Sequence, residues 1–121
     1  MAKICKDVFD IEVGEKDREF YSIAYTQNLL SGRWKPSILW YLKEESRRFN
    51  EIKQFLNNLS QGSLTKQLRE LEEDGLIQRQ VFPEVPPRVE YSLTTKGKEL
   101  LSILELMRAF GDRYRVQITV K

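Results

Sequence analysis

Residues 60–94 read SQGSLTKQLRELEEDGLIQRQVFPEVPPRVEYSLT, and their hydrophobic pattern changes from a helical to a strand period halfway along. The first half is bounded by Ser60, a residue type that caps helix N-termini, and by Gly75, which suits the left-handed position after a helix. Between them, leucines recur at helical spacing on one face: Leu64, Leu68 and Leu71. The stretch therefore predicts a helix over 61–74 with a buried leucine face.

The second half of this stretch predicts two antiparallel strands joined by a stiff loop. Apolar and polar residues alternate over 77–82 and again over 89–93, as they do in half-buried strands. Pro86 and Pro87 lie between the two runs and cannot donate backbone hydrogen bonds, so the loop should project instead of pairing. Residues 82–89 are thus expected to form the tip of a β-hairpin, which we call the wing.

Apolar periodicity predicts further helices on both sides of this stretch, in a mainly α-helical domain of the α+β class with a small antiparallel β-hairpin. We expect this domain over 20–111, preceded by an arm over 1–19 and followed by a tail over 112–121. A short extended piece is expected over 47–49. The other predicted helices run over 20–30, from about 36 to 42, over 51–56 after an N-cap at Asn50, and from about 95 to 110 after an N-cap at Thr94.

Composition excludes large classes of chemistry. The 121 residues suffice for one domain. Histidine is absent, which removes the commonest general base and zinc ligand, and a single cysteine, Cys5, allows neither an internal disulfide nor a multi-cysteine metal centre. We therefore expect no enzyme activity, no cofactor and no metal. The lone thiol and the lack of an apolar leader favour a cytoplasmic protein without membrane contact.

The predicted helix over 61–74 carries a polar, partly cationic face opposite its leucines. Cationic side chains can donate hydrogen bonds to guanine, hydroxyl groups can contact several base edges, and a glycine lets the backbone approach closely. At about 100° per residue, this outer face comprises Gly62, Lys66 and Arg69, with Ser63 and Thr65 at its flanks. A short helix, a turn, this helix and a hairpin predict a winged helix-turn-helix with helix 61–74 in the DNA major groove.

Phosphate contacts are expected around that helix. The free N–H groups at its start, near Gln61 and Gly62, suit a phosphate. Arg48, just before the helix pair, and Arg88, in the wing, could flank the groove. Arg48 is equally well explained as a solvated edge-strand residue.

Several segments resemble the HxlR family of bacterial, MarR-like winged helix-turn-helix transcription regulators. The wing segment, with its Val-Pro-Pro-Arg-Val-Glu-Tyr run, is the most specific. The resemblance covers about residues 20–111 and implies a dimeric DNA-binding regulator whose long terminal helices form the dimer interface. The matching segments are Gly32 to Lys35, Arg48 to Ile52, Leu64 to Leu76, and Pro83 to Thr94 followed by Gly97.

The apolar residues of the last predicted helix support a homodimer. They sweep more than half of the helix circumference, which is wider than the stripe that packing on one domain needs. The expected interface comprises Leu100, Leu101, Ile103, Leu104, Met107 and Phe110. The alternative is that the arm or the first helix of the same chain covers this surplus. As a homodimer, the protein is expected to bind double-stranded DNA at a pseudo-palindromic operator. A small-molecule effector is compatible with this role, and the sequence identifies none.

Two competing functions are open. Ser63 and Lys66 match the Ser-x-x-Lys of penicillin-recognising enzymes, but the Ser-Asp-Asn and Lys-Thr-Gly elements that such enzymes also need are absent from the sequence. The other alternative is a winged-helix protein-interaction module that does not bind DNA. Gly62 opposite the leucines argues against it, because a protein-binding face would be more apolar there.

Thiol sensing is not expected. Many members of the family carry a Cys-Pro near the start of the first helix, and the corresponding place here holds Tyr21-Ser22. Cys5 lies well upstream. Lys3 and Lys6 near it would make its thiol somewhat reactive. Reactivity alone is no switch, because a switch must bias an element that has two states.

Overall fold

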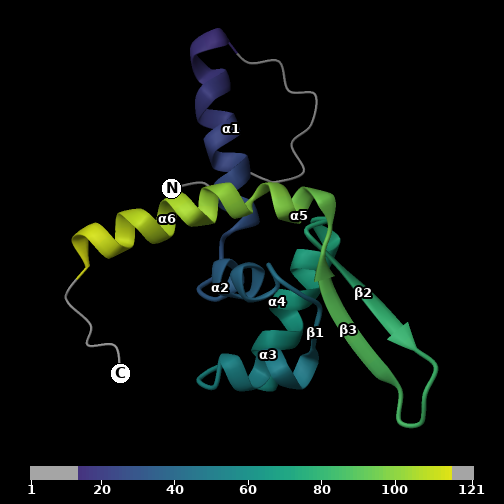
Figure 1. Ribbon diagram of the computed structural model, residues 1–121. Helices are drawn as coiled ribbons and strands as arrows, with labels where there is room; N and C mark the ends of the chain where they lie inside the picture. The colour runs from purple at the N-terminus through teal and green to yellow at the C-terminus, as the bar shows by residue number, and fades with distance from the viewer. Residues whose placement is uncertain (1–13, 116–121) are drawn as a thin grey trace.

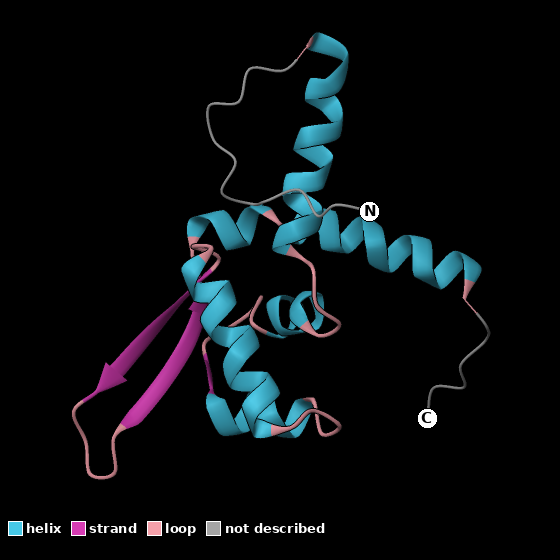
Figure 2. Cartoon of the chain, turned by 180° about the vertical axis from the view of Figure 1, so that it is seen from behind, coloured by secondary structure: helices cyan, strands magenta, loops and turns pink. Residues whose placement is uncertain are grey.

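The computed structural model describes residues 14–115 as a mainly helical winged-helix fold with a small three-stranded antiparallel sheet (Figure 1). Helices α1 and α6 extend away from the body formed by α2, α3 and α4, and the hairpin extends in another direction (Figures 1 and 2). The elements are α1 Glu15–Leu29, α2 Lys35–Tyr41, β1 Arg47–Arg48, α3 Phe49–Phe55, α4 Gln61–Glu73, β2 Ile77–Phe82, β3 Arg88–Leu93, α5 Thr95–Glu99 and α6 Leu101–Tyr114.

The core forms around the leucine face of α4, as the helical spacing predicts. Leu64 and Leu71 are fully buried and Leu68 is 2% exposed. They pack with apolar side chains from α2, α3 and the start of β2, among them Ile38, Leu39, Ile52 and Ile77. Lys35 is also buried, at 2% exposure, and its ammonium pairs with the Glu70 carboxylate of α4 at 3.0 Å.

Both predicted ends of α4 are confirmed. The Ser60 hydroxyl accepts a hydrogen bond from the Ser63 N–H at 3.1 Å, which satisfies one of the free donors of the first turn. At the other end, the N–H of Leu76 donates to the Leu71 carbonyl at 3.0 Å, and the N–H of Gly75 donates to the Glu72 carbonyl at 3.0 Å. Gly75 has φ +75°, so the helix ends in a Schellman motif.

The predicted hairpin is present, and a third strand joins it. β2 pairs with β3 from Ile77 opposite Leu93 out to Phe82 opposite Arg88. The extended piece predicted at 47–49 contributes β1, which pairs with the other edge of β3 through Arg47 opposite Tyr91. After Ile77, residues 78–81 of β2 are exposed on both faces, and the hairpin extends beyond the body (Figure 2).

Two helix starts differ from the prediction. α1 begins at Glu15, five positions before the expected start, so the last part of the predicted arm is helical. Glu15 and Asp17 in its first turn favour this start, because negative charge stabilises a helix N-terminus. α3 begins at Phe49, with Arg48 as its N-cap residue instead of Asn50. The Glu51 carboxylate accepts a hydrogen bond from the Arg48 N–H at 2.8 Å and thereby satisfies a donor before the helix.

The last predicted helix is divided in two and extends further than expected. α5 ends at Glu99, and α6 runs from Leu101 to Tyr114, into the predicted tail. At the junction the Leu100 N–H donates to the Gly97 carbonyl, a tighter turn than the α-helical one. Cys5 and most of the predicted arm lie outside the described residues.

The start of α5 packs tightly against the end of α4. The Thr94 hydroxyl accepts a hydrogen bond from the Gly97 N–H at 3.1 Å, as its predicted N-cap role requires, and donates one to the Gly75 carbonyl at 2.5 Å. The Thr94 N–H donates to the Leu76 carbonyl at 3.1 Å. Gly97 lies directly against that carbonyl, so a Cβ atom at this position would collide with its oxygen.

Replacing Gly97 with alanine should therefore lower the free energy of unfolding by about 1–3 kcal/mol, the usual cost of forcing atoms into a packed site. Urea denaturation followed by circular dichroism measures the change. Gly62→Ala is the matched control, because nothing lies within 4 Å of the Cβ position there. The control should be neutral or stabilising by up to about 1 kcal/mol. Equal stability of the two variants would contradict this packing.

Candidate nucleic-acid interface

The outer face of α4 is exposed as the sequence predicts. Burial of the leucines turns the opposite side of the helix to solvent. All six predicted residues are exposed: Gln61, Gly62, Ser63, Thr65, Lys66 and Arg69. The Thr65 hydroxyl donates to the Gln61 carbonyl at 2.9 Å, which leaves its oxygen free to accept a hydrogen bond from outside. The face thus combines two cations, two hydroxyls and an open glycine on one rigid helix.

A cleft between α4 and the hairpin adds a residue that sequence reasoning missed. Arg79 on β2 and Arg69 on α4 line this cleft together with Thr65, Glu72 and Tyr91. Arg79 is 3.8 Å from the Glu72 carboxylate, an ion pair that spans the turn at Gly75. The strand register pairs Arg79 with Tyr91 and thereby places Arg79 in this cleft. The alternation of residues along the sequence does not show which face of the hairpin lies next to α4.

Tyr91 on β3 lines the cleft beside α4, and this partly buried position changes the pKa of its hydroxyl. Burial raises the pKa of the Tyr91 hydroxyl above its ordinary value, while the charge of Arg79 lowers it and that of Glu72 raises it further. The side chain is therefore a neutral hydrogen-bonding group at physiological pH. It gives the cleft an uncharged wall beside two arginines.

Arg88, the wing residue predicted to contact a phosphate, is paired with two carboxylates. Its guanidinium lies 3.4 Å from the Glu84 carboxylate and 3.1 Å from that of Glu90, and it stacks 4.0 Å from the centre of the Phe82 ring. Its side chain is only 28% exposed. Two carboxylates offset its charge, so it stabilises the wing and is a weaker candidate for a phosphate contact than expected.

Arg48 remains a candidate, and the structure places it beside the wing. A groove between the start of α3 and the wing is lined by Arg48, Asn50 and wing residues 84–89. Arg48 is exposed, whereas its neighbour Arg47 pairs with Glu45 at 2.9 Å and stacks on the Tyr41 ring. The structure therefore separates two adjacent arginines that the sequence cannot rank.

A second candidate surface consists of apolar side chains on the two projecting helices. On α1, Phe20 is 69% and Ile23 66% exposed; on α6, Leu106 is 71% and Phe110 66% exposed. Ile103 and Met107 are also exposed, as predicted for an interface. These side chains have too little cover within the described chain for their size.

Two members of the predicted dimer interface, Leu100 and Leu104, are buried within their own chain. Leu100 and Leu104 are 7% and 5% exposed because they pack into the core of their own chain, and Leu101 packs partly against it. The break between α5 and α6 lets this side of the helix turn inward. The helical wheel thus predicts the excess of apolar surface and its exposed members Ile103, Met107 and Phe110, but it does not separate them from the residues that face the core.

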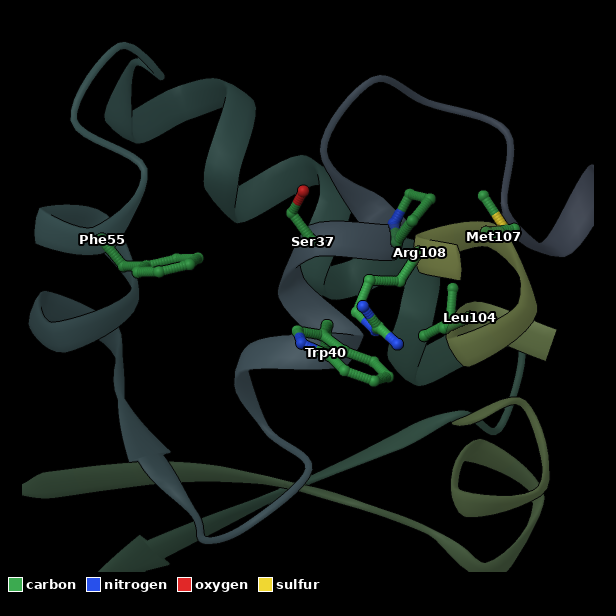
Figure 3. Close-up of a pocket in the computed structure, with 7 residues that line it drawn as sticks. Ser37, Trp40, Phe55, Leu104, Met107 and Arg108 are labelled. Atoms are coloured by element: carbon green, nitrogen blue, oxygen red, sulfur yellow. The ribbon is translucent and has the colours of Figure 1, made fainter. Parts of the chain in front are cut away.

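An open cavity of about 290 Å³ lies where α6 passes α2 and α3. Figure 3 shows Phe55 of α3 facing Trp40 and Arg108 across it, with Leu104 and Met107 on the α6 side. Arg108 is held by Glu105 and Asp112 on its own helix, and its hydrogen bond to Glu105 lowers the pKa of that carboxyl. The cavity is thus mainly apolar and continues into the exposed face of α6.

Other kinds of site find no support in residues 14–115. The acidic side chains there form no cluster that could hold a metal ion. In the same range, every helix is too short or too polar to cross a membrane. Ser63 and Lys66, which match the Ser-x-x-Lys of penicillin-recognising enzymes, lie exposed on the outer face of α4.

Comparison with known proteins agrees with this architecture. A family profile described as HxlR-like helix-turn-helix matches residues 29–119. The uncharacterised HTH-type transcriptional regulator YdeP of Bacillus subtilis is 39% identical over 108 residues, which cover 89% of this chain and 84% of YdeP. An uncharacterised HTH-type transcriptional regulator of Methanothermobacter thermautotrophicus is 45% identical over 98 residues, covering 81% and 75% of the two chains.

Solved structures give the same assignment. The redox regulator HypR in its oxidized form matches with a TM-score of 0.75 at 38% identity, covering 79% of this chain and 99% of HypR. The reduced transcriptional regulator YodB of Bacillus subtilis matches with a TM-score of 0.65 at 34% identity, covering 86% and 96%. This chain belongs to the HxlR-like helix-turn-helix family of transcriptional regulators.

Proposed function

We propose that the protein binds specific DNA sequences by inserting α4 into the major groove. The observation that carries this proposal is the state of the cations on the outer face of α4. Lys66 and Arg69 are exposed and form no ion pair with another described residue, whereas Lys35, Arg47 and Arg88 are each paired with a carboxylate. Unpaired cations on a rigid helix are available to base edges and phosphates.

Flanking elements would hold α4 in the groove. Arg48 lies along the groove beside the wing, where it can meet a phosphate on one side of the recognition helix. Arg79, near Arg69 in the cleft between α4 and β2, can reach the backbone on the other side once DNA competes with Glu72. Binding of this kind weakens as salt concentration rises.

The DNA-binding form is proposed to be a homodimer built through α1 and α6. Both helices extend from the body and expose large apolar side chains, and a two-fold dimer would cover both sets at once (Figure 1). The apolar cavity below α6 would lie next to this interface. Two recognition helices related by a two-fold axis would then read a pseudo-palindromic operator.

Regulation by a thiol is not part of this proposal. HypR is a redox regulator, and YodB has been crystallised after diamide treatment and with quinone bound. In this chain the position at which many members of the family carry a Cys-Pro holds Tyr21, which lies in the middle of α1.

Lys66→Ala and Arg69→Ala should each reduce the preference for operator over unrelated DNA by about 1–3 kcal/mol if the side chain reads a base. Arg48→Ala should instead weaken binding to all sequences alike and reduce the salt slope by about one. Fluorescence anisotropy over a range of NaCl concentrations, on DNA selected from fragments of the source genome, measures both effects. The assignment of roles is wrong if the Lys66 and Arg69 changes leave affinity and preference intact.

Leu106→Asp and Phe110→Asp should each raise the dissociation constant of the dimer about tenfold or more, because a charge replaces a large apolar side chain in the interface. Analytical ultracentrifugation at micromolar concentration measures the assembly. Val85→Asp is the control, since Val85 lies fully exposed at the wing, far from both helices in sequence. A wild-type monomer, or an equal effect of the control, would refute the interface.

Cys5→Ser should leave DNA affinity unchanged under reducing and oxidising conditions. The reason is that the position suited to a sensing thiol is occupied by Tyr21. Gel-shift titrations with and without diamide or a quinone measure the effect. Release of the wild-type protein, but not of the variant, by either reagent would identify Cys5 as a sensor.

A further inference from the structure

Three elements meet at the C-terminal end of α4 through one side chain. The Lys96 ammonium on α5 donates a hydrogen bond to the Asp74 carbonyl, at the end of α4, at 3.0 Å. It donates a second to the Tyr25 hydroxyl of α1 at 2.8 Å. Lys96 thus joins the proposed recognition helix to a helix of the proposed dimer interface.

The two sides of this junction are held very differently. Toward α4, the start of α5 is fixed by Thr94, whose hydroxyl and N–H bond to the Gly75 and Leu76 carbonyls, and by Gly97 against Leu76. Toward α1, the described core contacts come from the C-terminal part of the helix, where Leu29 is buried and Tyr25 is partly buried. The N-terminal part of α1, including Phe20 and Ile23, is exposed and gives no such support.

The groups around the Lys96 ammonium favour strong and directional hydrogen bonds. The C-terminal end of a helix carries partial negative charge, which favours an ammonium group. Hydrogen bonds from a charged donor are roughly twice as strong as neutral ones, and an ammonium has three donors to divide between its acceptors. Lys96 also lies 5.4 Å from the centre of the Tyr25 ring, close enough for a cation–π contact.

We propose that Lys96 is a positioning residue that sets the angle between α1 and α4, and thereby the separation of DNA half-sites that the dimer accepts. This inference rests on the proposed function. Tyr25 lies ten positions after Glu15, so the free part of α1 is a lever of about 15 Å. A tilt of roughly 10° at Tyr25 would move its far end by about 3 Å, close to the roughly 3.4 Å rise of one base pair.

The first test compares two lysine variants on operators of different spacing. Lys96→Met removes both hydrogen bonds, and Lys98→Met removes the same charge from an exposed position on the same helix. Binding is measured on the selected operator and on versions with one or two base pairs added or removed between half-sites. Lys96→Met should lose about fivefold affinity for the natural spacing relative to Lys98→Met, the worth of about one hydrogen bond. It should also discriminate less between spacings.

Further variants separate positioning from a general loss of charge. Tyr25→Phe keeps the ring and removes the acceptor, so it should flatten the spacing profile as Lys96→Met does, and the double variant should add little. Lys96→Arg retains a charged donor and should restore most of the spacing preference. Binding to an isolated half-site should be the same for Lys96→Met and Lys98→Met. Identical spacing profiles for these two variants would overturn the proposal.

A second test needs no DNA and therefore separates this inference from the proposed function. A nitroxide attached through Gln61→Cys, in the Cys5→Ser background, reports the distance between the two α4 helices of the free dimer by pulsed electron paramagnetic resonance. Lys96→Met should broaden the distance distribution and Lys98→Met should not. An unchanged distribution overturns the positioning role even if DNA binds. A wild type without sequence preference refutes the proposed DNA recognition, and a monomer refutes the proposed dimer together with this inference.

Discussion

Burial of one face of α4 is the constraint on which the rest of the molecule depends. Leu64, Leu68 and Leu71 are almost completely removed from water, which stabilises the fold by about 1.5–3 kcal/mol for each side chain. That sum is comparable to the net stability of a small domain. Rotating α4 about its axis to present other residues would expose these leucines. The outer face with Gly62, Lys66 and Arg69 is therefore fixed by the core behind it.

Contacts at the C-terminal end of α4 also fix the position of its neighbours. Its C-terminal turn contacts Thr94, Lys96 and the backbone of Gly97, so the proposed recognition helix is joined directly to α5, which leads into a helix of the proposed dimer interface. A shift of α1 or α6 in a partner-bound state would reach α4 through these contacts. Arrangements of this kind allow an event at a dimer interface to change DNA affinity without a ligand that touches the recognition helix.

The sequence predicts well what depends on local spacing and poorly what depends on contacts between distant residues. The caps at Ser60 and Thr94, the left-handed Gly75 and the leucine face follow from residues a few positions apart, and the structure confirms them. The break at Leu100 and the inward side of α6 depend on where the core lies, which no helical wheel contains. The ion pair between buried Lys35 and partly exposed Glu70 joins residues thirty-five positions apart and leaves no local signal in the sequence.

Surface arginines show most clearly that contacts between distant residues cannot be read from the sequence. The structure shows which of these arginines form ion pairs. Arg47, Arg48, Arg79 and Arg88 look alike in sequence, yet carboxylates hold three of them, and only pairing across strands and turns determines which. Exposed ion pairs contribute little to stability, so their absence at Lys66 and Arg69 costs the fold almost nothing. It leaves those charges ready for an external partner. Two exposed cations that form no ion pair with another described residue thus lie together on the outer face of α4, a placement that the net charge of +2 does not reveal.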